Sequence, residues 1–585
     1  MTHNQSNQKN KIWDSIIIFF SIIGLIACIA LLFPQVRRMI LDFIIQILNL
    51  GLFSYDNNYK FLLYLASGGI CFILFFNYCT LTKSGRSLVQ EVKKEIRDCW
   101  SEIDYKSFIK PVLLMLAIYS FGILTIIRAN NLYRDDIVYS IIGSREWHNW
   151  SRYINVFLSY FVQPEINITD ISPIPQLLAV FILSCSSVLL VFILSKGKIT
   201  TLRLLASIPL GLSPYFLECL SYKFMAHFFA FSVLTCLVPF LFIARKKAFF
   251  FVSVVFLVIM CMTYQAASGI YILITIILCF QYWNSREKTN KEILNFLGIA
   301  AIAYCFSMLL FRFFLMRPVE FEGFDHSTEM LSITQFIPGI LNNIKDYAFF
   351  IYHDFGMIWK IGIVITVLFF ILKSIYSTVQ RKILSLFVSI ILIGLSFILS
   401  FGVYLLLAKP AFNPRAMFGF GVFLAIMCVY AISDYKKVAA FFVIALNWCF
   451  FVFAFSYGNA IADQARYEEF RIGILLNDLS TLYLDQNKNV MYIHLKNTIE
   501  FAPTVKNIAK HNPVIEQLVY KRLEETHSPL NCNYFLDHFN YNSNMKYIGS
   551  TENDDFNTSN LPVVLDSYYH TIKSDGEHIL VILKH

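Results

Sequence analysis

The chain has few charged residues and lacks the common signatures of soluble catalytic domains. Asp, Glu, Lys and Arg make up 15% of its 585 residues, whereas a soluble globular chain carries about 25%. No GxxxxGK[ST] phosphate loop, HExxH pair or dinucleotide-binding glycine pattern occurs, which argues against a nucleotide-driven pump. The 13 cysteines include no CxxC pair, so we expect neither a disulfide scaffold nor a cysteine metal centre.

Apolar side chains are abundant instead. They make up 57% of the residues, with 58 Phe and 32 Tyr, and the mean hydropathy is +0.59. Because a transmembrane helix needs about 20 apolar residues, the sequence predicts a polytopic α-helical membrane protein. The candidate spans, about thirteen in number, are 14–34, 61–81, 109–128, 175–195, 202–218, 224–244, 248–264, 267–283, 293–316, 350–373, 383–408, 415–433 and 438–457. The span at 202–218 is short and contains Pro209 and Pro214.

Basic residues in the short loops predict the orientation, because cytoplasmic loops carry the excess of Lys and Arg. With the N-terminus inside, the cytoplasmic loops hold 23 Lys and Arg and the outer loops hold 12. We therefore expect a cytoplasmic N-terminus and an outer C-terminus. This distribution of the net charge of +9 indicates a membrane protein and gives no reason to expect a nucleic-acid partner. Residues 83–110 alternate charged and apolar side chains, which is typical of either a helix on the anionic inner leaflet or a solvated connector.

The composition changes after Phe455, and this divides the chain. We expect a membrane extension over 1–108, a membrane domain over 109–457 with an outer loop at 129–174, and a soluble domain over 458–585. The last part combines a stretch of helical spacing, ARYEEFRIGILLNDL, with the β-rich runs NVMYIHL, PVVLDSYYHTI and HILVILK. These patterns predict a small α/β domain on the outer face.

The outer loop 129–174 carries the candidate chemistry. Asp135 and Asp136 are adjacent carboxylates at a membrane exit, and neighbouring carboxylates resist simultaneous ionisation, so that one pKa rises and the pair can supply a base. A solvated acidic pair balanced by Arg134 is the alternative interpretation. A carboxylate base beside cations at a membrane surface suits glycosyl transfer from a lipid phosphate.

Aromatic and basic residues follow the acidic pair in the same loop. Trp147 and Trp150 are candidates for stacking on a sugar ring, although interfacial anchoring is the more usual role of either tryptophan alone. Arg145 is a candidate for binding the donor phosphate.

Three other outer turns add candidates. Arg415 is the best phosphate ligand among them, because guanidinium binds phosphate through two donors and keeps its proton; its alternative role is an interfacial anchor. The further candidates are Lys223 for the donor phosphate and Glu218, Tyr222, Tyr264 and Gln265 for substrate binding. The sequence has no clustered His and Cys residues that predict a metal site.

Five segments occur in an order that resembles a known family. They are NLYRDDIVYSIIG, ITDISPIPQLLAV, PYFLECLSYKF, YQAASGIY and FNPRAMFGFG, and the closing SYYHTIKSDGEHILVILK adds to the similarity. Together they resemble the serotype-converting O-antigen glucosyltransferases of enteric bacteria and their phages, which belong to the GT-C superfamily. The resemblance covers most of 110–585. Lys-Phe-Met at 223–225 stands where the family has an Arg-Phe-Asp-like run, and the first 100 residues resemble an extension.

The resemblance implies a GT-C type enzyme of the bacterial inner membrane with a periplasmic C-terminal domain. Such an enzyme transfers a glucosyl residue from undecaprenyl-phosphate glucose to the O-antigen of lipopolysaccharide, with inversion, and Asp135 or Asp136 would act as the base. A donor synthase and a small flippase would be its functional partners. No cofactor is implied, and nothing in the residues supports a divalent cation.

Two other classes of membrane protein stay open as alternatives. A transporter or flippase usually holds its functional charges at mid-membrane, whereas the acidic pair lies in a loop and the predicted spans have few charges. A polymerase or ligase of the same pathway would have one long outer loop between late spans in place of a C-terminal domain. The sequence fits a glucosyltransferase better than either.

Overall fold

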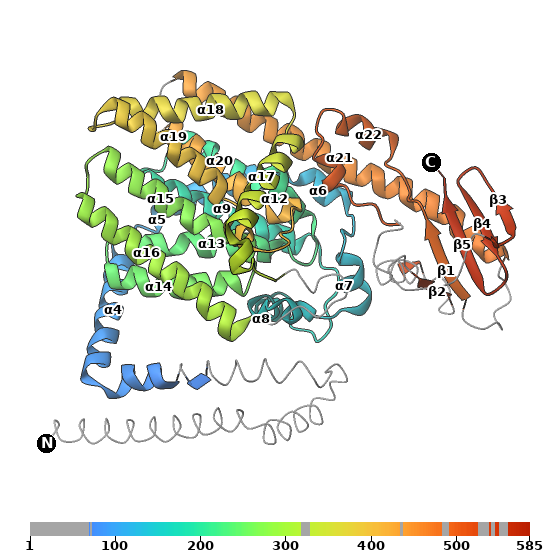
Figure 1. Ribbon diagram of the computed structural model, residues 1–585, viewed down its shortest axis with the longest axis horizontal. Coiled ribbons are helices and arrows are strands. Elements are labelled where there is room, and N and C mark those ends of the chain that lie inside the picture. Colours follow the sequence, from blue (N-terminus) through green and yellow to red (C-terminus); the bar gives the residue numbers. More distant parts are fainter. Residues whose placement is uncertain are drawn as a thin grey trace.

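The computed structural model describes residues 69–70, 73–316, 328–432, 437–482, 491–523, 538–539, 545–548 and 560–584. A helical bundle leads through one long helix to a small β-sheet (Figure 1). The predicted span at 14–34 and residues 61–68 and 71–72 of the one at 61–81 lie outside the described residues, and so does most of the predicted extension over 1–108.

The α-helices are α4 (Lys83–Ser101), α5 (Lys106–Gly122), α6 (Leu124–Ala129), α7 (Asp136–Ile142), α8 (Tyr153–Val162), α9 (Ile174–Leu194), α10 (Thr201–Ala206), α11 (Pro209–Leu212), α12 (Pro214–Ser221), α13 (Ala226–Leu237), α14 (Lys246–Cys261), α15 (Ser268–Asn284), α16 (Asn290–Leu310), α17 (Phe336–Asp354), α18 (Met357–Tyr376), α19 (Lys382–Leu399), α20 (Gly419–Ala431), α21 (Lys437–Leu482), α22 (Pro503–Ala509) and α23 (Ile515–Leu518). Short 3-10 helices are η1 (Glu146–Trp150), η2 (Val238–Phe242), η3 (Gln265–Ala267), η5 (Ile333–Gln335), η6 (Gly402–Leu406) and η7 (Pro414–Ala416), while η4 (Phe311–Leu315) is a π-helix.

Within the described residues, six helices are long and apolar enough to cross a membrane. They are Ile174–Leu194, Gln265–Asn284, Asn290–Leu315, Met357–Tyr376, Lys382–Leu399 and Lys437–Leu482. The predicted span at 202–218 is a pair of helices that bend by 62°, and Pro214 opens the second of them because proline cannot continue the helix before it. Counting this pair gives seven spans, so the predicted number of thirteen is not confirmed.

Burial separates inner from outer helices. In the most apolar part of α9 and of the α15 span, 61% and 72% of the residues are buried, against 22% in α16, α18 and α19. Helices that are apolar on all sides yet exposed suit a lipid environment. The short α8 also exposes apolar side chains, with Phe157 58% and Phe161 73% exposed, as expected for a helix lying in a membrane surface.

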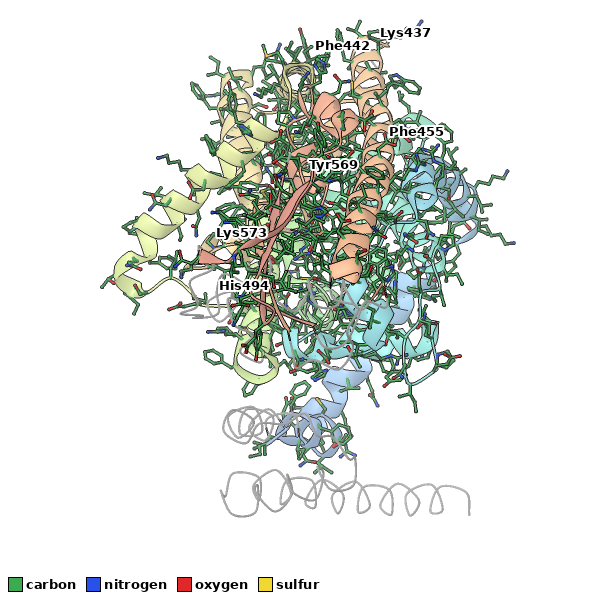
Figure 2. All side chains as sticks on the ribbon, turned by 90° about the vertical axis from the view of Figure 1, so that its right-hand side faces the viewer. Lys437, Phe442, Phe455, His494, Tyr569 and Lys573 are labelled. Carbon is green, nitrogen blue, oxygen red and sulfur yellow. The ribbon has the colours of Figure 1, made fainter. Side chains whose placement is uncertain are left out.

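The long helix α21 crosses the predicted domain boundary at 457/458 without a break. Its 46 residues correspond to about 69 Å at 1.5 Å per residue, more than twice the hydrocarbon thickness of about 30 Å. Figure 2 shows Lys437, Phe442 and Phe455 in order along it. Farther along, Ile472, Leu475 and Leu479 form a core with residues of the sheet.

The sheet has five strands in the order β2-β1-β5-β4-β3. They are β1 (Met491–Lys496), β2 (Met545–Ile548), β3 (Val563–Asp566), β4 (His570–Ser574) and β5 (His578–Leu583). β1 pairs in parallel with β2 and β5, with Ile493 opposite Ile579, while β3, β4 and β5 pair antiparallel. The three β-rich runs therefore do form strands, and His494 and Lys573 lie on this sheet in Figure 2.

Polar contacts gather at the two ends of the bundle. At one end α4 packs against the first turn of α14, with Glu91 2.5 Å from Lys247 and the backbone N–H of Ala248 donating to Glu95. The segment around 83–110 is thus helical and ion-paired to the bundle. The other end carries α7, α12, η7 and residues 501–522; we call it the site end.

Candidate active site

The chain between α6 and α7 makes two sharp turns that place the acidic pair. Asn130 caps α6 in the left-handed conformation, with φ 46°, and Arg134 has φ 48°. A side chain other than glycine holds this conformation at a cost of about 1–2 kcal/mol, and such positions occur often at functional sites. The turn at Arg134 lies immediately before α7, and the side chains of Tyr133 and Arg134 both reach Glu218.

Asp136 is the first residue of α7 and has no solvent-exposed surface. Its carboxylate accepts backbone N–H groups of Tyr133 at 3.0 Å, Lys223 at 2.9 Å and Phe224 at 3.4 Å. Burial raises the pKa of Asp136 to about 8, although the three backbone donors lower it. The charge of Asp135 also raises this pKa and makes the smallest contribution. The sequence predicts that the neighbouring carboxylate raises the pKa, but desolvation is the larger effect.

Asp135 is partly exposed and stands before α7 as its N-cap residue. Its side chain does not cap the helix, and among the residues that the structure describes its carboxylate has no hydrogen bond or ion pair. The charge of Asp135 acts on the Tyr139 hydroxyl, whose pKa is raised first by burial and then by this carboxylate. Asp135 is therefore the member of the pair that can accept a proton from a bound ligand.

Glu218 on α12 joins three elements at the site end. Its fully buried carboxylate lies 3.3 Å from Nε of Arg134 and accepts the Tyr133 hydroxyl at 3.2 Å and the backbone N–H of Arg415 at 2.5 Å. These contacts use the lone pairs of both oxygens. Glu218 thereby connects the outer loop to the turn at η7.

Arg415 follows Pro414 in η7 and is anchored through its backbone. Its guanidinium carbon lies 5.5 Å from the centre of the Tyr222 ring, a cation–π distance. In the described part of the chain the guanidinium has no hydrogen bond or ion pair, and the buried Tyr222 hydroxyl has no hydrogen-bond partner. The Arg415 guanidinium and the Tyr222 hydroxyl are thus neighbouring hydrogen-bond donors that have no acceptor among the described residues.

A second cation–aromatic group adjoins the first. The guanidinium carbon of Arg152 is 4.9 Å from the Tyr264 ring centre and 5.9 Å from that of Trp150. Phe229 lies between the two groups, since its ring centre is 5.5 Å from that of Tyr222 and 4.7 Å from that of Tyr264. Gln265 begins η3 next to Tyr264 and is partly exposed.

Three of the predicted residues, namely Arg145, Trp147 and Lys223, have other partners. Arg145 donates to Ser159 at 2.9 Å and to the carbonyls of Gln163 and Ile166, so it closes the loop around α8. Trp147 is 2% exposed and contacts the rings of Tyr139 and Phe228.

Lys223 pairs with Asp170 at 2.7 Å. Burial by itself would raise the pKa of Asp170, but its hydrogen bonds from Lys223 and Ser172 outweigh burial and lower the pKa. The Lys223 ammonium therefore already has a counter-charge. No group of three or more His, Cys, Asp or Glu residues suited to a metal ion occurs among the described residues.

Arg134, Arg152 and Tyr133 belong to the site although the sequence analysis assigned them no substrate role. The segment 517–520 also reaches it, because Leu518 accepts the Tyr133 hydroxyl at 2.9 Å and the Tyr520 ring lies 5.3 Å from the Arg134 guanidinium. The basic residues were visible as members of the outer loop. Nothing in the sequence connected a segment almost 400 residues downstream.

Comparison with known proteins identifies the class. The glucosyl transferase GtrII family matches residues 124–426, which is more than half of the chain, and the chain belongs to this family. It is 23% identical over 437 residues to an uncharacterized 55.3 kDa protein in the gtrB 5' region of Salmonella phage P22, a match that covers 70% of this chain and 86% of that protein. No solved structure matches the chain.

Proposed function

We propose that this membrane protein transfers a glucosyl residue from undecaprenyl-phosphate glucose to a sugar of the O-antigen on the periplasmic face. Membership in a glucosyl transferase family supports the transfer of glucose. The observation that supports this site best is that the charged groups of Asp135 and Arg415 have no hydrogen bond or ion pair among the described residues, while Glu218 connects Arg134, next to Asp135, with the backbone of Arg415.

In this mechanism Asp135 accepts the proton of the attacking acceptor hydroxyl. The hydroxyl oxygen forms a bond to the anomeric carbon as the bond from that carbon to the phosphate oxygen breaks, with inversion. The phosphate leaves with the bonding electrons, and Arg415 stabilises its negative charge because guanidinium donates two parallel hydrogen bonds to phosphate. Arg152 supplies positive potential beside Tyr264.

The remaining residues have supporting roles. Asp136 holds the backbone of Tyr133, Lys223 and Phe224, so we assign it to positioning. Glu218 orients Arg134 and the turn that presents Arg415. Trp150, Tyr222, Tyr264 and Gln265 stay candidates for contacting the sugar or the lipid phosphate, whereas the contacts of Arg145, Trp147 and Lys223 favour structural roles.

Purified protein, undecaprenyl-phosphate glucose and O-polysaccharide test the proposal, with a soluble glucose nucleotide as the control donor. We expect transfer from the lipid only. Arg415→Ala should weaken donor binding and lower kcat, while Arg415→Lys should recover part of both because the charge returns without the two-donor geometry. Transfer from the nucleotide alone, or full activity in Arg415→Ala, would contradict the proposal.

A further inference from the structure

A cavity of about 510 Å³ lies between α7, the Asp170–Lys223 pair and the C-terminal half of α21. Its volume falls within the range of about 300–1,000 Å³ that is usual for pockets holding small ligands. Both the outer loop and the C-terminal part of the chain contribute to its wall, the latter through Glu469 and Arg522. The mechanism above uses neither Glu469 nor Arg522.

The cavity is separate from the reacting pair. On α7 it is lined by Ile137, Ser140 and Ile141, which at i, i+3 and i+4 share one face of the helix. At about 100° per residue, Asp135 and Tyr139 lie on the opposite side of α7. A ligand in the cavity would therefore be held beside the site without occupying the position of the reacting hydroxyl.

The charges in the cavity wall are already balanced. Lys223 lies 2.7 Å from Asp170, and Arg522 lies 3.7 Å from Glu468 and 3.8 Å from Glu469. A phosphate or a cation would have to compete with these pairs. The remaining surface offers hydrogen-bonding groups next to the aliphatic side chains of Ile137 and Ile141, which suits an uncharged ligand with many hydroxyl groups.

We propose that this cavity is a second saccharide subsite, which binds a portion of the acceptor polysaccharide next to the repeat that is modified. This inference rests on the proposed function. A polymeric acceptor extends beyond its reacting sugar, and the cavity provides neutral, polar space on the other side of the helix that follows Asp135. Acceptors longer than one repeat should therefore bind more tightly than a single repeat.

Glu469→Trp tests the subsite by filling it. The Glu469 side chain is 58% exposed, so tryptophan can be accommodated there, and Glu468 still pairs with Arg522. Asp463→Trp is the matched control, because it replaces a carboxylate of the same helix that is 36% exposed and lies outside the cavity wall. The measurements are the acceptor KM for polysaccharide released from lipopolysaccharide and for its isolated single repeat.

In the unaltered protein the KM for polysaccharide should be about tenfold lower than for the single repeat, as expected for one or two additional polar contacts. Glu469→Trp should remove this difference and leave kcat, the donor KM and single-repeat kinetics unchanged, while Asp463→Trp should retain it. Ser140→Leu provides a second filling variant, since among the described residues the Ser140 hydroxyl donates only to the carbonyl of Ile137 in its own helix. If both filling variants retain the preference for polysaccharide, the inference is wrong; absence of transfer to either acceptor by the unaltered protein would contradict the proposed function instead.

Discussion

Asp135 and Asp136 are neighbours in the chain but have opposite environments. Asp136 is buried and accepts three backbone N–H groups, whereas Asp135 is partly exposed and its carboxylate has no partner in the described part of the chain. Asp135→Asn should therefore lower kcat by about 10²- to 10⁴-fold, the usual effect of removing a positioned base. Donor KM and the melting temperature in detergent should not change.

The control for this prediction is Asp463→Asn, which removes a partly exposed carboxylate from α21 and should leave kcat unchanged. Glucosyl transfer from the lipid donor at saturating concentrations of both substrates measures the effect. Retention of full activity by Asp135→Asn would assign the base elsewhere.

The buried Asp136 makes stability depend on pH. Its folded-state pKa of about 8 lies above the ordinary value of 3.8, so the folded state favours the protonated form. The resulting stabilisation is complete below pH of about 4 and is lost as the pH rises through about 8. Asp136→Asn does not titrate, so the melting temperature of the unaltered protein minus that of the variant should decrease over this window. A difference that stays constant or increases with pH would contradict the environment described for Asp136.

At the scale of elements, Glu218 is the contact that joins α12, η7 and the loop before α7. Glu218→Gln leaves Arg134 without its buried counter-charge, and breaking such a pair costs about 3 kcal/mol or more. Glu287→Gln removes the partner of Lys196, an exposed pair, and should cost less than about 1 kcal/mol. Detergent-solubilised variants compared by thermal unfolding measure both effects, and equal losses would show that Glu218 is not the junction.

The elements also show which sequence patterns were reliable. The β-rich runs form β1, β3, β4 and β5, because alternating and β-branched residues suit a half-buried sheet. Long apolar runs form α9, α15, α16, α18, α19 and α21. The predicted run at 350–373 instead contains the end of α17 at Asp354 and the start of α18 at Met357, since hydropathy alone does not detect a break within an apolar stretch.

For the whole molecule, the orientation of the chain in the membrane is the feature that places the site. The excess of 23 over 12 basic residues predicts that the C-terminal sheet is on the outer side of the membrane. Alkaline phosphatase fused after Lys584 should be active, whereas a fluorescent protein at the same position, exported in unfolded form, should stay dark. Fusions after Arg97 should show the opposite pattern. A bright, phosphatase-inactive C-terminal fusion would reverse the topology.

Composition and local pattern were sufficient for the membrane class and the strands, because lipid selects for apolar runs of a set length and half-buried strands select for alternating apolar residues. They could not separate the two aspartates, since burial and hydrogen bonding depend on Lys223, Phe224 and the turn at Arg134. Composition and pattern also did not predict the partners of Arg145, Trp147 and Lys223. They did not predict that Leu518 contacts Tyr133. The contacts of Arg145, Trp147 and Lys223 depend on how the outer loop folds onto itself and onto residues 223–225, and the contact of Leu518 depends on the packing of the C-terminal segment against the bundle.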